Sequence, residues 1–131
     1  MLVDTSGWFC IFDDDDHRHD SATDLYRSHP FRLTHNYIIA ELVPLIIARR
    51  KGLSKALDAV ASVLEDVNVE IVWVDQTLTR RAIELLNERR DKTWSICDAV
   101  SFILMSEFGL NDALTTDHHF KQAGFNQLLE S

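Results

Sequence analysis

The chain has 131 residues, of which 46% are hydrophobic and 26% are charged, and its formal net charge is −8 at pH 7. This length and balance predict a soluble protein with one globular domain, residues 1–131. The acidic excess argues against non-specific binding of a polyanion, which requires a strong basic surface.

The first part of the chain is predicted to form a strand and then helical segments. Residues 1–4 are expected to be a buried strand, and residues 5–7 turn the chain into an apolar helical turn at 8–12. The acids of residues 13–16 favour the start of a helix, because negative side chains are stabilised at a helix N-terminus. This helix should run to about Ser28 and lie near the surface, since it is mostly polar.

The next segment is predicted to be a strand followed by two helices. The strand covers residues 31–34, and Asn36 is a good N-cap for a helix that runs to about Lys51. Residues 54–67 then form an amphipathic helix. The apolar side chains whose helical spacing places them inward are Leu57, Val60, Ala61 and Leu64.

Strands and helices continue to alternate to the end of the chain. Strands are predicted at residues 70–74 and 113–116, with a possible edge strand at 127–129. Helices are predicted at residues 77–90, 95–108 and 119–123. This alternation implies an α/β fold of three α/β/α layers, in which a central parallel sheet of four to five strands carries helices on both faces. Ligands of such sheets bind at the carboxyl ends of the strands.

The cysteines and the apolar runs indicate the compartment. Cys10 and Cys97 both lie in apolar segments, so we predict reduced, buried thiols and no disulfide scaffold. No uncharged apolar run approaches the roughly 20 residues that cross a bilayer. Asp4 interrupts the N-terminus and no basic segment precedes it, which argues against a signal peptide. We therefore expect a cytoplasmic protein with no membrane partner.

Three carboxylates stand alone in stretches that otherwise carry no charge. They are Asp4 in MLVDTSGWFCIF, Glu41 in NYIIAELVPLIIA and Asp98 in TWSICDAVSFILMS. A buried carboxylate is unfavourable unless a positive or hydrogen-bonding group meets it, and these stretches contain no Lys or Arg. Asp117, in ALTTDHHF, follows a predicted strand at the same sheet edge as Asp4. If the four acids converge, a divalent cation can hold them together.

Each of these acids also has a simpler interpretation. Asp98 and Glu41 lie in the first turns of helices, and Asp4 and Asp117 can cap the helices that follow them. Four acids that all occupy strand ends or first helical turns are less easily explained by capping than by one pocket. Because Mg²⁺ prefers hard oxygen ligands, an acidic set without cysteine or paired histidines matches a Mg²⁺ site.

Four segments in this order and spacing resemble the PIN-domain ribonucleases, and among them the VapC-type toxins of type II toxin–antitoxin pairs. They are LVDTSGW, the AEL around Glu41, CDAVSFILMSEFG and ALTTDHHFKQAGF. The resemblance covers essentially the whole chain and implies one pocket of catalytic, metal-binding acids with two supporting hydroxyls. The acids are Asp4, Glu41, Asp98 and Asp117, and the hydroxyls are those of Ser6 and Thr115.

The same resemblance implies a function and its partners. The expected activity is endonucleolytic cleavage of RNA with one or two Mg²⁺ or Mn²⁺ ions, by a homodimer that a cognate antitoxin protein inhibits. The sequence departs from many relatives at His119, where they carry a further acid. Whether one or two ions bind is therefore left open. The alternatives are an RNA-processing nuclease that is not a toxin, a phosphoacceptor signalling domain and a catalytically idle interaction module.

Other polar and aromatic residues are given structural roles. Residues 13–16 (DDDD) are interpreted as a solvated loop and helix start. His118 and His119 are interpreted as adjacent surface histidines, in preference to RNA contacts or proton donors. The tryptophans are expected in the core or at a dimer interface rather than as platforms for bases. They are Trp8, Trp73 and Trp94.

Overall fold

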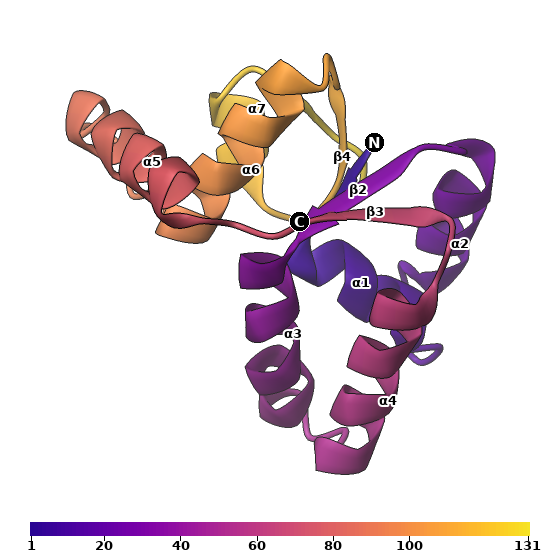
Figure 1. The fold of residues 1–131 in the computed structure, drawn as a ribbon. Helices are drawn as coiled ribbons and strands as arrows, with labels where there is room; N and C mark the ends of the chain where they lie inside the picture. Colours follow the sequence, from indigo (N-terminus) through magenta and orange to yellow (C-terminus); the bar gives the residue numbers. More distant parts are fainter.

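A five-stranded parallel sheet forms the centre of the protein (Figure 1). The structure is a computed structural model that describes residues 1–131. The strands are β1 (Leu2–Val3), β2 (Arg32–His35), β3 (Val69–Val72), β4 (Asp112–Leu114) and β5 (Asn126–Gln127). Their order is β3-β2-β1-β4-β5, and each neighbouring pair is parallel. The predicted α/β fold with a parallel sheet of four to five strands is confirmed.

Seven helices cover the two faces of this sheet. They are α1 (Thr5–Phe12), α2 (His19–Ser28), α3 (Asn36–Ala48), α4 (Leu53–Glu65), α5 (Gln76–Glu88), α6 (Ile96–Glu107) and α7 (His118–Gln122). Figure 1 shows α1 to α4 on one side of the strands and α5 to α7 on the other. None of the helices is both long enough and apolar enough to cross a membrane.

The strand order places a switch point beside β1. From β1 the chain builds outward through β2 and β3, and it then returns to the other side of β1 with β4 and β5. The connections leave in opposite directions at this point, which opens a crevice at the carboxyl ends of the strands. Asp4 follows β1 directly, and residues 115–117 follow β4, so both segments reach this crevice.

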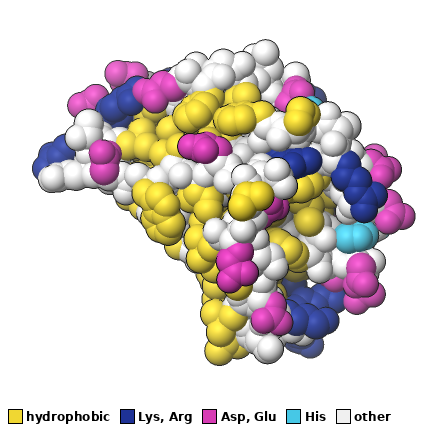
Figure 2. All heavy atoms as spheres, turned by 45° about the vertical axis from the view of Figure 1, so that its right-hand side comes forward, with side chains coloured by type: hydrophobic (Ala, Val, Ile, Leu, Met, Phe, Trp, Pro, Cys, Tyr) yellow, Lys and Arg dark blue, Asp and Glu magenta, His cyan; other side chains and the backbone are white.

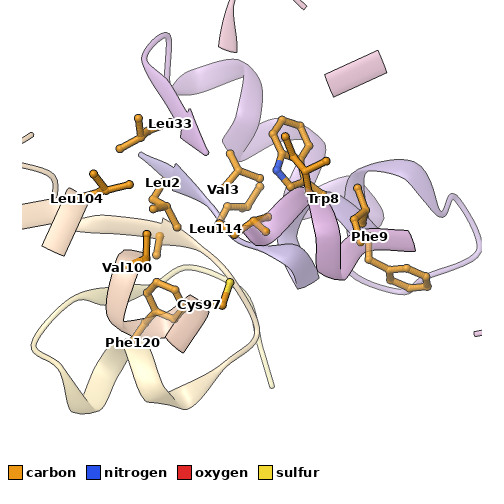
Figure 3. Close-up of a cluster of buried hydrophobic side chains, with 14 of the residues drawn as sticks. Leu2, Val3, Trp8, Phe9, Leu33, Cys97, Val100, Leu104, Leu114 and Phe120 are labelled. Atoms are coloured by element: carbon orange, nitrogen blue, oxygen red, sulfur yellow. The ribbon is translucent and has the colours of Figure 1, made fainter. Parts of the chain in front are cut away.

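The core lies on both faces of β1. Successive strand residues point to opposite faces. In Figure 3, Leu2 accordingly lies toward Val100 and Leu104 of α6, while Val3 lies toward Trp8 of α1. All five side chains are buried, and they belong to a single cluster of 28 buried apolar residues. Packing therefore fixes both faces of this two-residue strand, and with them the direction of the residue that follows it.

The predicted inward face of the helix at 54–67 is wrong. Three of its four side chains are exposed, namely Leu57, Ala61 and Leu64, and Val60 is half-buried. The buried residues of α4 are Ala56, Ala59 and Val63, and α4 packs closely on α3. This helix has apolar residues on two faces, and the smaller ones allow the closer approach to α3. The larger ones stay at the surface.

A cap and a strand end also differ from the prediction. The N-cap of α3 is His35, whose ring Nδ1 accepts the N–H of Ile38 at 3.4 Å, and not Asn36. Asn36 instead uses Oδ1 to accept the N–H of Val74 at 2.6 Å. The strand β3 ends at Val72, two residues before the predicted end at residue 74.

The run of four aspartates is not uniformly solvated. The Asp16 side chain is 7% exposed, and the Arg18 guanidinium donates to both of its oxygens at 3.0 Å. These hydrogen bonds lower the pKa of Asp16 to about 2. Asp13 pairs with Lys51 at 3.3 Å. The interpretation of residues 13–16 as a solvated loop is therefore wrong for Asp13 and Asp16.

The cysteines and two tryptophans lie where the sequence predicts. Cys10 and Cys97 are free and buried. Trp8 and Trp94 are buried, whereas Trp73 is 65% exposed and does not belong to the core. A role of Trp73 at a dimer interface stays a prediction.

Gly7 allows α1 to lie against β4, and its substitution tests this packing. A Cβ at Gly7 would clash with the carbonyl oxygen of Leu114. We expect Gly7→Ala to lower the free energy of unfolding by about 1–3 kcal/mol, measured by urea denaturation. Helix propensity alone would make Gly7→Ala stabilising, because alanine favours a helix more than glycine does. A loss of stability therefore indicates the clash. Ser62→Ala, on the exposed side of α4, is the control, and equal stability of Gly7→Ala and the parent would contradict the close approach.

Candidate functional site

A cavity of about 660 Å³ opens at the carboxyl ends of β1 and β4, and all four acids singled out in the sequence line it. Each comes from a different element. Asp4 follows β1, Glu41 belongs to α3, Asp98 belongs to α6, and Asp117 follows β4. No Lys or Arg lines the cavity, and none forms an ion pair with any of these four acids. The residues that are far apart in sequence thus meet in one acidic site.

Asp4 is held by a chain of hydroxyl groups. Its side chain is nearly buried, and the hydroxyl of Thr115 donates to Asp4 Oδ2 at 2.9 Å. Because that proton points to Asp4, the hydroxyl of Ser6, 3.2 Å from Thr115 Oγ1, must be the donor in their contact. Ser6 Oγ in turn accepts the N–H of Thr116 at 3.0 Å, and Thr115 Oγ1 accepts the N–H of Asp117 at 3.0 Å. Ser6 and Thr115 therefore orient the Asp4 carboxylate, as neutral donors.

Asp98 both caps its helix and faces the cavity. It forms a capping box with Ser95, in which the Ser95 N–H donates to Asp98 Oδ2 at 3.0 Å and the Asp98 N–H donates to Ser95 Oγ at 3.0 Å. The ring Nδ1 of His119 lies 2.9 Å from the same Oδ2. Oδ2 thus receives two hydrogen bonds, while Oδ1 accepts none. The capping interpretation is correct for Asp98, and it leaves one oxygen available.

The same division applies to Asp117. Its Oδ1 accepts the N–H of His119 at 2.9 Å and caps α7, and its Oδ2 accepts no hydrogen bond. Asp4 precedes α1 but makes no capping bond with its side chain. Glu41 lies in the second turn of α3 and caps nothing. Helix capping therefore accounts for two of the four acids only.

Burial and the nearby negative charges make the charged forms of Asp4 and Glu41 unfavourable. Burial raises the pKa of Asp4 to about 7, the Thr115 hydrogen bond opposes this, and the charges of Asp98 and Asp117 add to it. Glu41 is an exposed residue, yet partial desolvation raises its pKa as well, against the hydrogen bonds from Thr5 and Cys97. The Thr5 hydroxyl donates to Glu41 Oε2 at 3.3 Å. A site of this kind gains stability from any cation that enters it.

The donor set fits a hard divalent cation. Carboxylate oxygens are the ligands that Mg²⁺ prefers, and Mg²⁺ keeps several of its waters when a protein binds it. The four carboxylates do not all lie within 4.8 Å of one another, unlike the ligand atoms of Asp117, His118 and His119. At about 660 Å³, the cavity has room for an ion together with its waters. A second group of close acids, Asp13 to Asp15, lies outside this cavity.

Several residues of the site were not singled out from the sequence. Thr5 and Ser95 bind two of the acids, and Ser95 was recognisable from its spacing to Asp98, which is that of a capping box. His119 was predicted to be a surface histidine, and that prediction is wrong, since its side chain is 17% exposed and contacts Asp98. His118 is 66% exposed, as predicted. Only the packing of α7 against α6 brings His119 to Asp98.

Comparisons with known proteins agree with this fold. Residues 1–126 match the PIN domain family. The 23S rRNA-specific endonuclease VapC20 of Mycobacterium tuberculosis (strain ATCC 25618 / H37Rv) is 34% identical over 126 residues, which are 95% of each chain. The crystal structure of Mycobacterium tuberculosis VapC20, described as a sarcin–ricin loop cleaving toxin, has a TM-score of 0.86 to this chain at 31% identity. That match covers 96% of each chain.

The raised pKa of Asp4 predicts a specific dependence of stability on pH. The folded protein keeps a proton on Asp4 up to about pH 7, whereas the unfolded chain releases it near pH 3.8. The free energy of unfolding should therefore fall as the pH rises from about 4 to about 7 in EDTA. Asp4→Asn should remove this fall and be more stable than the parent at pH 8, by an amount on the order of 1–4 kcal/mol.

Asp112 provides the matched control for this experiment. Its hydrogen bonds from Asn126 and His29 lower its pKa, so Asp112→Asn should lose stability at pH 8. Urea denaturation of the parent and the two variants at pH 5 and pH 8 measures these changes in the free energy of unfolding. At pH 8 we expect a gain for Asp4→Asn and a loss for Asp112→Asn. If the free energy of unfolding depends on pH in the same way for the parent and for Asp4→Asn, Asp4 is not a buried carboxyl group with a raised pKa.

Proposed function

Because the chain belongs to the PIN-domain family, we propose that it is a Mg²⁺- or Mn²⁺-dependent endoribonuclease and the toxin of a toxin–antitoxin pair. The observation that carries this proposal is the convergence of Asp4, Glu41, Asp98 and Asp117 on one cavity without Lys or Arg. The relatives support RNA as the substrate, since VapC20 is named as a 23S rRNA-specific endonuclease. A structured ribosomal RNA loop is therefore the first substrate to test.

The four acids would hold one or two divalent ions. When bound, such an ion lowers the pKa of a water ligand and neutralises charge that develops on the phosphate and the leaving oxygen. The chain itself prepares the carboxylates. Thr115 and Ser6 orient Asp4, the backbone N–H of Ser95 orients Asp98, and Thr5 holds one oxygen of Glu41. Because these hydrogen bonds come from uncharged groups, they can hold the carboxylates in position before an ion binds.

The charge of the site explains why a cation is needed for this function. An RNA phosphate and a cavity lined by four carboxylates repel each other, and no basic side chain lines the cavity to offset them. The formal charge of −8 gives no general attraction for RNA either. Divalent ions would therefore attract the phosphate as well as activate water. EDTA should abolish binding and cleavage together.

We also propose that residues 1–131 act as one domain, with an antitoxin and a second copy of the chain as partners. One buried cluster includes residues from the helices on both sides of the sheet, which supports a single domain. Figure 2 shows hydrophobic side chains along the lower part of the molecule, where α3 and α4 lie in Figure 1. Exposed apolar side chains that support a protein partner there are Ile47, Leu53, Leu57 and Leu64.

Substitution of the acids tests the proposed activity. Asp4→Asn and Asp98→Asn should each reduce RNA cleavage by more than about 100-fold, because each removes a charge that holds the ion. Glu107→Gln is the matched control, since Glu107 also lies on α6 but pairs with Arg81 at the surface. Cleavage is measured on a panel of structured RNAs with Mg²⁺, Mn²⁺ or EDTA, and circular dichroism verifies folding.

The outcomes separate the alternatives. Full cleavage by both acid variants, or by the parent in EDTA, would reject a metal-dependent nuclease at this site. Absence of RNA cleavage by the parent with either ion would favour a catalytically idle interaction module. Cleavage without growth inhibition, and without an adjacent antitoxin gene, would favour an RNA-processing nuclease that is not a toxin.

A further inference from the structure

We propose that His119 is a positioning residue, which fixes the carboxylate of Asp98 so that Oδ1 faces the cavity. This inference rests on the proposed function, since it assumes that Asp98 holds an ion. It assigns a role to a residue that the sequence indicated only as a surface histidine. The assignment depends on the contacts of the ring.

One residue contacts two of the four acids. The backbone N–H of His119 donates to Asp117 Oδ1 at 2.9 Å, and its ring Nδ1 lies 2.9 Å from Asp98 Oδ2. His119 is in the first turn of α7, whereas Asp98 is in the first turn of α6. The residue therefore connects the starts of two helices, and it sets the relative position of two carboxylates that are 19 residues apart in sequence.

The contacts of the ring make it a donor to Asp98. An ionised carboxylate only accepts hydrogen bonds, so Nδ1 must carry the proton that lies between them. The other ring nitrogen, Nε2, lies 3.4 Å from the hydroxyl of Thr93, which can donate or accept. Both nitrogens are thus directed at protein groups. With the proton on Nδ1 directed at Asp98, this atom has no lone pair to offer an ion.

The Asp98 carboxylate shows what this bond achieves. The backbone N–H of Ser95 and the ring of His119 both donate to Oδ2, and Oδ1 accepts nothing. Two donors on the same oxygen oppose rotation of the carboxylate, because rotation would break both bonds. A carboxylate held in this way presents one fixed oxygen to a cation. Partners of this kind typically change metal affinity or activity by about 10–100-fold when they are removed.

The neighbouring histidine has none of these features. The His118 side chain is 66% exposed, and its Nδ1 lies 3.7 Å from Asp117 Oδ1 without a hydrogen bond. Adjacent identical residues are thus in very different environments. His119 differs in its lower exposure, 17% against 66%, and in the contacts of its ring with Asp98 and Thr93. A histidine that only faced solvent would need neither feature.

The test measures the affinity of Mn²⁺ for the full chain without RNA, by electron paramagnetic resonance of the free ion. His119→Ala should weaken Mn²⁺ binding about 10–100-fold. His119→Asn should recover most of the affinity, because the amide nitrogen of Asn can replace Nδ1 as the donor. His29→Ala is the control, since His29 Nε2 also contacts an acid, Asp112 Oδ2 at 3.2 Å, but lies outside the cavity.

The results that overturn the inference are distinct. If both His119 variants lower the urea midpoint but bind Mn²⁺ as the parent does, the role is structural only. Nitrogen couplings in pulsed resonance spectra of the parent complex that disappear in His119→Ala would make the ring a ligand instead of a positioning residue. If the parent itself binds no Mn²⁺, the proposed metal site fails and this inference fails with it. The positioning role is supported if His119→Ala binds Mn²⁺ weakly and His119→Asn recovers the affinity.

Discussion

The carboxylate of Asp4 is the constraint on which the rest of the structure depends. It lies at the end of the central strand, 7% exposed, and the hydroxyl of Thr115 is the one side chain that donates to it. No Lys or Arg offsets its charge, and burial raises its pKa to about 7. The fold therefore places an acid where its charge is unfavourable, and three further acids surround the same cavity. A cation that entered the cavity would offset the negative charge of these acids.

The features of the fold around this acid serve to hold it. The packing of both faces of β1 fixes the direction of Asp4, and Gly7 lets α1 lie close enough to β4 for Ser6 to reach Thr115. The donors that orient the carboxylates are hydroxyls, backbone N–H groups and one imidazole ring. They restrict movement without the full charge of a guanidinium or ammonium group. The site thus stays acidic and rigid at the same time, as a cation site requires.

The sequence predicted the sheet and the convergence of the acids, because both depend on local patterns. A lone acid such as Asp98, in an apolar helix, is nearly buried, so its surroundings must satisfy it. The errors arose where two local patterns compete or where the partner is distant. The helix at 54–67 has two apolar faces, and only its fit against α3 selects the one with Ala56 and Ala59. The local sequence does not distinguish His119 from His118. Only the packing of α7 brings the His119 ring to Asp98.

The most direct test of the central claim is the anomalous scattering of Mn²⁺ in crystals of the protein. The account predicts a peak in the cavity at the ends of β1 and β4, about 2 Å from oxygens of Asp4, Asp98 or Asp117. The free Oδ1 of Asp98 should be among its ligands. A cavity without such a peak at saturating Mn²⁺, or a peak only at Asp13 to Asp15, would contradict the claim that these acids gather to hold a cation.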